Sequence, residues 1–419
     1  MDLLDRSLTA FHACSEIAKI LEENSFTQLK EGVKWNLEAN KGYYLVRNGS
    51  SLIAFKCGEG YSFNIVASHS DSPCFKLKTD FEMKVDNYRK FNVEKYGGGI
   101  FYSWLDRPLT VAGRLIVKRD GELRSVEFSS SHTFIIPSLA IHFNRTVNDG
   151  VKLNPQVDLS PIESILNDGK LDEEIKNFAN GEVVDADLYL VCSQKPFTAG
   201  ADDELISSPR IDNLTSAFSS VEGLIHGEEK AINVVFVADN EEVGSRTKQG
   251  AGSKFLYDTL LKISLSMGKT EEDLKDSLNS SFLISSDNAH AVHPNHPELS
   301  DPANRVLMGK GVVIKKHAGQ NYTTDGFSSA IVKQIFDKAG VSHQDFFMRS
   351  DLPCGGTLGA ISSSQLSIKS ADIGLGQLAM HSAVETFAFS DFEEEVKGLT
   401  LFYSCSMTSD GYESVKIDF

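Results

Sequence analysis

The sequence predicts an α/β fold built on a largely parallel or mixed sheet and interrupted by a β-rich insertion. From about residue 200 onward, apolar runs typical of buried strands alternate with stretches of helical spacing. Between about 80 and 199, short alternating runs replace that pattern, and helix signals are few. Several of the apolar runs are followed directly by acidic or imidazole side chains. In an open α/β sheet such side chains meet in the crevice beyond the carboxyl ends of the strands.

The first 80 residues predict one helix and two strands. Residues 3–25 carry apolar side chains at helical spacing, which indicates an amphipathic helix. Strands are expected at 42–56 and 61–68, and the second leads directly into His69.

Residues 81–199 are the predicted inserted domain. Alternating runs at 113–118 and 125–128 flank Asp120-Gly121, a dipeptide that favours a two-residue hairpin turn. Its main helix signal is the charged stretch 162–178. The remaining segments, 1–80 and 200–419, would form one discontinuous domain. In the second of these segments we expect strands at 232–238, 282–286 and 344–349, and helices at 251–266, 328–338 and 377–388.

Composition excludes some functions. The net charge of −17 would repel a nucleic-acid backbone across most of the surface. No apolar run approaches the roughly 20 residues that a membrane helix needs. The first residues lack the basic stretch and apolar core of a signal peptide. Six cysteines without CxxC spacing suggest reduced thiols rather than a disulfide framework. We therefore expect a cytoplasmic protein that binds neither nucleic acid nor membrane.

Two adjacent acids, Glu241 and Glu242, are the most informative feature. They follow the apolar run 232–238, where two neighbouring carboxylates repel each other unless a cation offsets their charge. A metal ion would do so and would give each acid a different task. Glu242 would bind the ion, and Glu241 would stay free to move a proton.

Further side chains could complete a site for two divalent ions. The predicted ligand set contains two imidazoles and three carboxylates: His69, Asp212, Glu242, Asp287 and His381. Mixed nitrogen and oxygen donors suit zinc, or manganese and cobalt where oxygen dominates. Each residue alone has an ordinary explanation, such as a helix N-cap for Asp212 or a half-buried helical histidine for His381. Their joint occurrence after strand ends favours metal chemistry.

Five motifs in order resemble the M18 aminopeptidases, the aspartyl aminopeptidase family. The resemblance runs from the first predicted helix almost to the last residue. The motifs are SHSDSP at 68–73, SPRIDN at 208–213, DNEEVGS at 239–245, NAHAVHPN at 288–295 and QLAMHS at 377–382.

The resemblance implies an α/β/α di-metal peptidase domain with an inserted dimerisation domain, and a role for each site residue. His69 and Asp287 would complete one zinc site, Glu242 and His381 the other, and Asp212 would bridge them. Asp71 would orient His69, and Glu241 would act as general base and then acid. The positions that would contact substrate are His290, Lys315, Tyr322 and, in a neighbouring subunit's site, His142. The family's dimers assemble into a tetrahedral dodecamer.

The expected reaction is removal of N-terminal residues from peptides by a metal-activated water. Lys315, as a cation in a small cleft, would favour an N-terminal Asp or Glu. A cis peptide bond at Asp212-Asn213 is expected by analogy with related two-metal peptidases. Two alternatives remain open at this point: a metal-dependent deacylase or carboxypeptidase on a similar fold, and a non-catalytic oligomeric scaffold.

Overall fold

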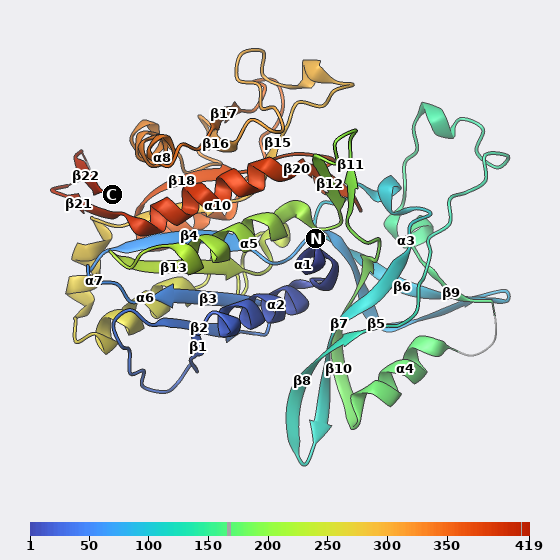
Figure 1. Ribbon diagram of the computed structural model, residues 1–419. Coiled ribbons are helices and arrows are strands. Elements are labelled where there is room, and N and C mark those ends of the chain that lie inside the picture. Colours follow the sequence, from blue (N-terminus) through green and yellow to red (C-terminus); the bar gives the residue numbers. More distant parts are fainter. Residues whose placement is uncertain (166–168, 412) are drawn as a thin grey trace.

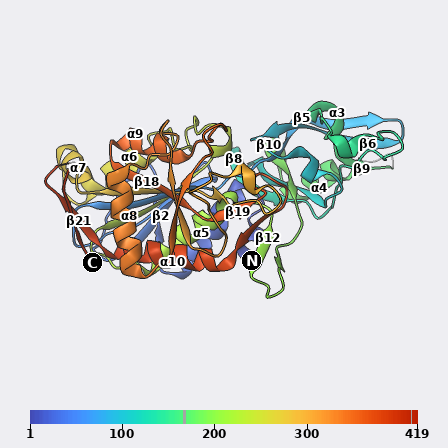
Figure 2. The same ribbon diagram turned by 90° about the horizontal axis from the view of Figure 1, so that it is seen from above.

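The computed structural model describes residues 1–165, 169–411 and 413–419. A nine-stranded sheet with helices on both faces forms the larger part of the molecule, and a six-stranded sheet projects from one end of it (Figures 1 and 2). The α/β fold with a mixed sheet is confirmed. None of the helices in the described ranges is both long and apolar enough to cross a lipid bilayer.

The nine-stranded sheet is mixed. In spatial order its strands are β1 (Thr27–Gln28), β2 (Gly42–Arg47), β3 (Ser51–Lys56), β13 (Ile232–Ala238), β4 (Phe63–His69), β14 (Phe282–Ser286), β18 (Lys369–Gly374), β16 (Val312–Lys316) and β17 (His343–Phe347). The four central strands, from β13 to β18, run parallel to one another. Every residue of β4, β13 and β14 is buried, as expected where helices cover both faces.

Two apolar cores lie on the two faces of this sheet. One contains side chains of α1 (Asp2–Arg6), α2 (Ala10–Glu23), α5 (Ile211–His226), α8 (Gly326–Ala339) and α10 (Phe389–Ser404). The other contains side chains of α6 (Phe255–Ser266), α7 (Glu271–Leu278) and α9 (Leu358–Leu366). Figure 2 shows α5 and α10 on one side of the sheet and α6 and α9 on the other.

The six-stranded sheet is antiparallel and has its own apolar core. In spatial order its strands are β8 (Glu122–Ser129), β7 (Leu109–Arg119), β10 (Glu182–Cys192), β5 (Cys74–Val85), β6 (Tyr88–Tyr96) and β9 (Ile162–Ser164), and α4 (Lys170–Ala179) packs against it. The connection from β8 to β9 contains η2 (Val147–Asp149) and α3 (Pro155–Asp158), and η1 (Phe101–Trp104) follows β6.

A five-stranded sheet lies where the two larger parts meet. Its strands are β11 (Phe197–Ala199), β12 (Leu205–Ser208), β20 (Glu385–Ala388), β19 (Gly376–Leu378) and β15 (Ala289–His290). The remaining elements are η3 (Glu241–Val243), η4 (Pro297–Leu299), β21 (Ser406–Ser409) and β22 (Val415–Asp418).

Several local predictions are confirmed. Strands occupy 232–238 and 282–286 as expected, and Asp120 and Gly121 form the hairpin turn between β7 and β8 with φ of 51° and 82°. The strand predicted at 344–349 is β17, and the helices predicted at 251–266 and 328–338 are α6 and α8. The stretch 162–178 contains β9 and most of α4, and residues 166–168 lie outside the described residues.

Three local predictions are wrong. The helix at 3–25 is two helices, because Thr9 takes an extended conformation and begins α2 as its N-cap. The strand at 42–56 is a hairpin, because Asn48-Gly49 forms a turn with positive φ at both residues. The helix at 377–388 is absent. That segment forms β19, a loop and β20, and β20 pairs with the distant strand β12.

Candidate active site

Three neighbouring parallel strands deliver most of the expected site residues to one edge of the nine-stranded sheet. His69 is the last residue of β4, Glu241 and Glu242 follow β13 in η3, and Asp287 follows β14. Because β13 and β14 both pair with β4 in parallel, the three strand ends open side by side. This is the position at which open α/β sheets bind ligands.

The other two residues lie next to strands of the five-stranded sheet. Asp212 stands at the start of α5, just after β12, and His381 lies in the loop between β19 and β20. Ser208 of β12 pairs with Glu385 of β20, which brings the two segments together. The expected cis peptide bond at Asp212-Asn213 is present. The prediction that His381 lies on a helix is wrong, since its φ is 66°.

All five expected ligands converge. His69, Asp212 and Asp287 form one group, and Asp212, Glu242 and His381 form another, with ligand atoms within 4.8 Å of one another in each group. Asp212 faces both groups. Its Oδ1 lies 3.5 Å from His69 Nε2, and its Oδ2 lies 3.3 Å from His381 Nε2. One carboxylate oxygen is therefore directed toward each group, which is the geometry of a bridging ligand.

The site has the properties that a metal ion requires. Asp212 Oδ1 is buried and accepts no hydrogen bond, which is costly unless a cation or another donor occupies the space beside it. The donors are imidazole nitrogens and carboxylate oxygens, the set that suits zinc. Glu241 forms a further group with His69 and Glu242. The residues present thus fit divalent metal.

The pKa values of the two histidines also fit a site for divalent metal. Desolvation alone would lower the pKa of His69, but the nearby Asp212 and Asp287 carboxylates raise that pKa well above the usual value. Desolvation opposes the same shift at His381, where the Asp212 and Glu242 carboxylates raise the pKa to about 10. Protons on the imidazoles thus offset the carboxylates, and a divalent ion would displace those protons on binding.

Burial also raises the pKa values of the neighbouring acids Glu241 and Glu242. It raises the pKa of Glu241 to about 8, and the Asp287 and Asp71 carboxylates contribute to the rise. The pKa of Glu242 is raised well above its usual value, again first by burial. The crowding of acids inferred from the sequence is therefore present in the fold.

Comparison with known proteins agrees with this geometry. The family model described as "Aminopeptidase I zinc metalloprotease (M18)" matches residues 3–403. The chain belongs to the M18 family of aminopeptidases. It is a metalloaminopeptidase, a hydrolase that acts on peptide bonds.

Relatives match this M18 aminopeptidase over nearly its whole length. A probable M18 family aminopeptidase 2 of Clostridium novyi is 43% identical, with 96% of this chain and 97% of the relative covered. A probable aspartyl aminopeptidase of Ricinus communis is 34% identical, with 96% and 94% covered. Solved structures agree in fold. Ape4 in complex with Nbr1 has a TM-score of 0.91 at 32% identity, with 96% and 84% covered, and the S. cerevisiae mApe1 dodecamer has 0.82 at 27%, with 96% and 94% covered.

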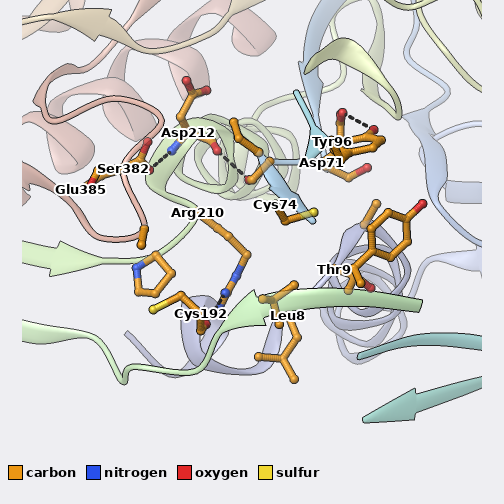
Figure 3. Close-up of a pocket in the computed structure, with 18 of the residues that line it drawn as sticks. Leu8, Thr9, Asp71, Cys74, Tyr96, Cys192, Arg210, Asp212, Ser382 and Glu385 are labelled. Atoms are coloured by element: carbon orange, nitrogen blue, oxygen red, sulfur yellow. Dashed lines mark hydrogen bonds between the residues drawn. The ribbon is translucent and has the colours of Figure 1, made fainter. Parts of the chain in front are cut away.

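Asp71 of this aminopeptidase forms hydrogen bonds with His69 and with the backbone of Glu241 and Glu242. Its backbone carbonyl lies 3.0 Å from His69 Nδ1, which leaves Nε2 directed at the ligand group. Its carboxylate accepts the backbone N–H groups of Glu241 and Glu242 at 3.1 and 3.2 Å. The Tyr96 hydroxyl donates to the same carboxylate at 2.7 Å (Figure 3). Asp71 therefore holds in place the turn that carries both glutamates.

A glycine segment, Gly97–Gly99, passes directly over the site. The Gly98 carbonyl lies 3.1 Å from His381 Nδ1, so it can accept the ring N–H and leave Nε2 free. Gly97 has a φ of 74°, and a Cβ added there would lie 3.2 Å from Glu242 Cβ. The sequence analysis did not identify this contact. Three consecutive glycines are the signal, because only glycine allows so close a backbone approach.

Glu385 was also missed. It is buried, and its carboxylate accepts backbone N–H groups of Asp212 and His381. Figure 3 shows Glu385 and Asp212 at the wall of a cavity of about 40 Å³, which also contacts Cys74, Tyr96 and Arg210. That cavity has room for a few water molecules only and is too small for a peptide.

Three of the four expected substrate-binding residues lie near the candidate site, and His142 does not. Lys315 and Tyr322 adjoin Asp287, with the Lys315 ammonium 5.1 Å from the Tyr322 ring centre, and His290 packs near Phe346 beside a cavity of about 230 Å³. Lys315 is only 1% exposed and donates to the backbone carbonyls of Asp287 and Asn288. It is thus buried beside Asp287, where the sequence analysis placed it in a small cleft.

His142 lies apart from this group. It is exposed on the connection between β8 and α3.

Proposed function

We propose that this M18 aminopeptidase holds two divalent ions, zinc in preference to manganese or cobalt, and removes N-terminal residues from peptides. One observation carries the proposal: the two carboxylate oxygens of Asp212 face two separate ligand groups. When bound, such a pair of ions polarises a carbonyl and lowers the pKa of water. His69 and Asp287 would hold one ion, and Glu242 and His381 the other.

The chain's own residues would carry the proton. Glu241 belongs to the group with His69 and Glu242 but is not needed to complete either ligand set. Its carboxylate would accept a proton from water as general base and pass it to the departing amine as general acid. Burial favours the protonated form of Glu241, which strengthens its carboxylate as a base.

A preference for N-terminal Asp or Glu is the finer part of the proposal. A relative of this chain is named a probable aspartyl aminopeptidase. Lys315 is a buried cation 4.0 Å from Asp287 Oδ2, so its positive charge acts on the site at short range and with little screening. The preference would arise from the field of Lys315 rather than from an exposed ammonium in a cleft.

Assembly into dimers and then a dodecamer is the proposed quaternary structure, with residues 81–199 as the dimerisation domain. The loop that carries His142 exposes Leu139, Ile141 and Phe143, the last of which is 80% exposed. Exposed apolar side chains grouped in this way mark interaction surfaces. The structure of the S. cerevisiae mApe1 dodecamer resembles this chain. His142 would contact substrate in a neighbouring subunit. The six free cysteines support a reducing, cytoplasmic setting.

The test compares hydrolysis rates over a panel of N-terminal aminoacyl substrates, with and without chelator, for the wild type and Glu241→Gln. We expect the variant to keep its bound metal and lose roughly 10²–10⁴-fold in rate. N-terminal acetylation should abolish cleavage, because an aminopeptidase requires the free amine. Cleavage of the acetylated substrate at an undiminished rate, or full activity of Glu241→Gln, would refute the mechanism.

A further inference from the structure

The buried carboxylate of Glu385 connects two of the segments that carry proposed metal ligands. The backbone N–H of Asp212 donates to Glu385 Oε2 at 2.9 Å, and the backbone N–H of His381 donates to Glu385 Oε1 at 2.7 Å. Asp212 and His381 belong to different segments that are far apart in the sequence. Glu385 itself is 1% exposed, so water does not compete for these bonds.

The same carboxylate reaches the third ligand-bearing segment through two amide side chains. Gln377 Nε2 lies 3.4 Å from Glu385 Oε1, and Gln377 Oε1 accepts from Asn288 Nδ2 at 2.7 Å. Asn288 is the residue after Asp287, and its side chain also donates to the Ile211 carbonyl at 3.1 Å. All of these side chains are buried. A buried network of this kind specifies a single arrangement only when every member is satisfied.

The backbone that Glu385 contacts includes or adjoins residues with positive φ. Arg210, which leads into Asp212, has a φ of 62°, and His381 has a φ of 66°. Residues other than glycine adopt this left-handed region at a cost of about 1 kcal/mol or more. Such conformations persist only where surrounding contacts enforce them. The two N–H bonds to Glu385 are contacts of this kind, one on each segment.

We infer that Glu385 is a positioning residue that sets the separation and orientation of Asp212 and His381 and so forms the second metal site. It acts through their backbones and touches neither substrate nor metal. Each of its oxygens accepts a backbone hydrogen bond from one of the two segments. The inference rests on the proposed metal site and adds to it the residue that aligns the ligands.

Glu385→Gln is the sharpest variant, because it keeps the shape and replaces one acceptor with an NH₂ group that faces a backbone N–H. Asp391→Asn is the matched control. Asp391 is an equally buried carboxylate whose oxygens accept the N–H groups of Gly309 and Gly311 at 2.7 and 2.8 Å, and neither glycine belongs to the site. Both variants therefore remove one buried acceptor for a backbone N–H.

The readouts are zinc stoichiometry and affinity by chelator competition, the absorption spectrum of the cobalt-substituted protein, and the Tm of the metal-free protein. We expect both variants to lower the metal-free Tm to a similar degree. Only Glu385→Gln should weaken one of the two ions, by about 10–100-fold, and change the cobalt spectrum. Unchanged affinity and spectrum in a folded Glu385→Gln protein would overturn the inference.

If Glu385→Gln does not fold, Glu385→Asp provides the test. Its carboxylate is one methylene shorter and cannot reach both N–H groups at once, so the affinity for one ion should again fall. Wild-type affinity for both ions in Glu385→Asp would overturn the inference. A wild-type protein that binds no metal would instead refute the proposed function, so the two failures are distinguishable.

Discussion

Replacing Gly97 with Ala should weaken the proposed metal site, although Gly97 is not one of the proposed ligands. A Cβ at this position would lie 3.2 Å from Glu242 Cβ, 3.4 Å from Glu242 Oε2 and 3.4 Å from Pro73 Cα. These contacts are closer than the roughly 3.5–4.0 Å at which carbon atoms attract. Because the Pro73 contact is with backbone, Glu242 is the side that must move, by a few tenths of an ångström. Metal ligands tolerate displacement poorly.

The Gly97→Ala substitution has two free-energy costs that can be measured separately. The first is the backbone cost, since Gly97 has a φ of 74° and alanine pays about 1–2 kcal/mol there. The second is the displaced ligand, for which a loss of about 10–100-fold in metal affinity is expected, equal to about 1.4–2.7 kcal/mol. Only the second cost concerns the site.

Gly121→Ala isolates the first cost. Gly121 has a φ of 82°, and a Cβ there would meet no atom within 4 Å. Both variants should lose similar stability in denaturant titrations of the metal-free protein. Chelator competition should then show weaker metal binding for Gly97→Ala alone, with a parallel loss of kcat at limiting zinc. Equal metal affinity in the two variants would refute the argument that the glycine segment fixes Glu242.

Three further predictions concern charge and metal. Lys315→Met should reduce hydrolysis of Asp-peptides far more than of Leu-peptides. It should also lower the Tm, because the carbonyls that accept hydrogen bonds from Lys315 lose their donor. An unchanged ratio of the Asp-peptide and Leu-peptide rates would show that Lys315 does not determine specificity. Burial, followed by the nearby Arg210 cation, lowers the pKa of His12 to about 4. The native state therefore keeps His12 neutral while the unfolded chain takes up a proton below about pH 6.5, so stability is full above that pH and falls by up to about 3 kcal/mol toward pH 4. His12→Asn should flatten this pH dependence in urea titrations, and an unaltered slope would contradict the assignment. Removing metal with a chelator should lower the unfolding free energy by about 2.7 kcal/mol relative to protein with free zinc at 100 times its Kd, and a Tm that does not respond to metal would argue against the site.

The sequence predicted the parts of the fold that depend on local pattern. Strands β13 and β14 are mostly apolar runs, and a proposed metal ligand follows each of them, so their extent and their expected role follow from order along the chain. The turn at Asn48-Gly49 was equally readable, since that dipeptide favours a hairpin, yet the apolar run on either side masked it.

The parts that could not be predicted depend on contacts between distant segments. The apolar spacing of residues 377–388 fits a helix, and only pairing with β12 makes the segment a strand and places His381 in a loop. Glu385 looks like a surface acid in the sequence. Its role depends on two backbone N–H groups, those of Asp212 and His381, and no side-chain pattern encodes these. Backbone donors leave no signature in a list of residues.

The path of the chain from β6 through Gly99 connects the projecting sheet directly to the proposed active site. Tyr96 ends β6 and bonds the Asp71 carboxylate, and two residues later the Gly98 carbonyl bonds the His381 imidazole. Deleting the sheet to obtain a minimal enzyme would therefore cut away the supports of its own ligands. Conversely, attachment to a surface or to another copy could tilt the projecting sheet. Such a tilt would also move the His381 imidazole, because only two residues separate the end of β6 from the carbonyl that contacts it.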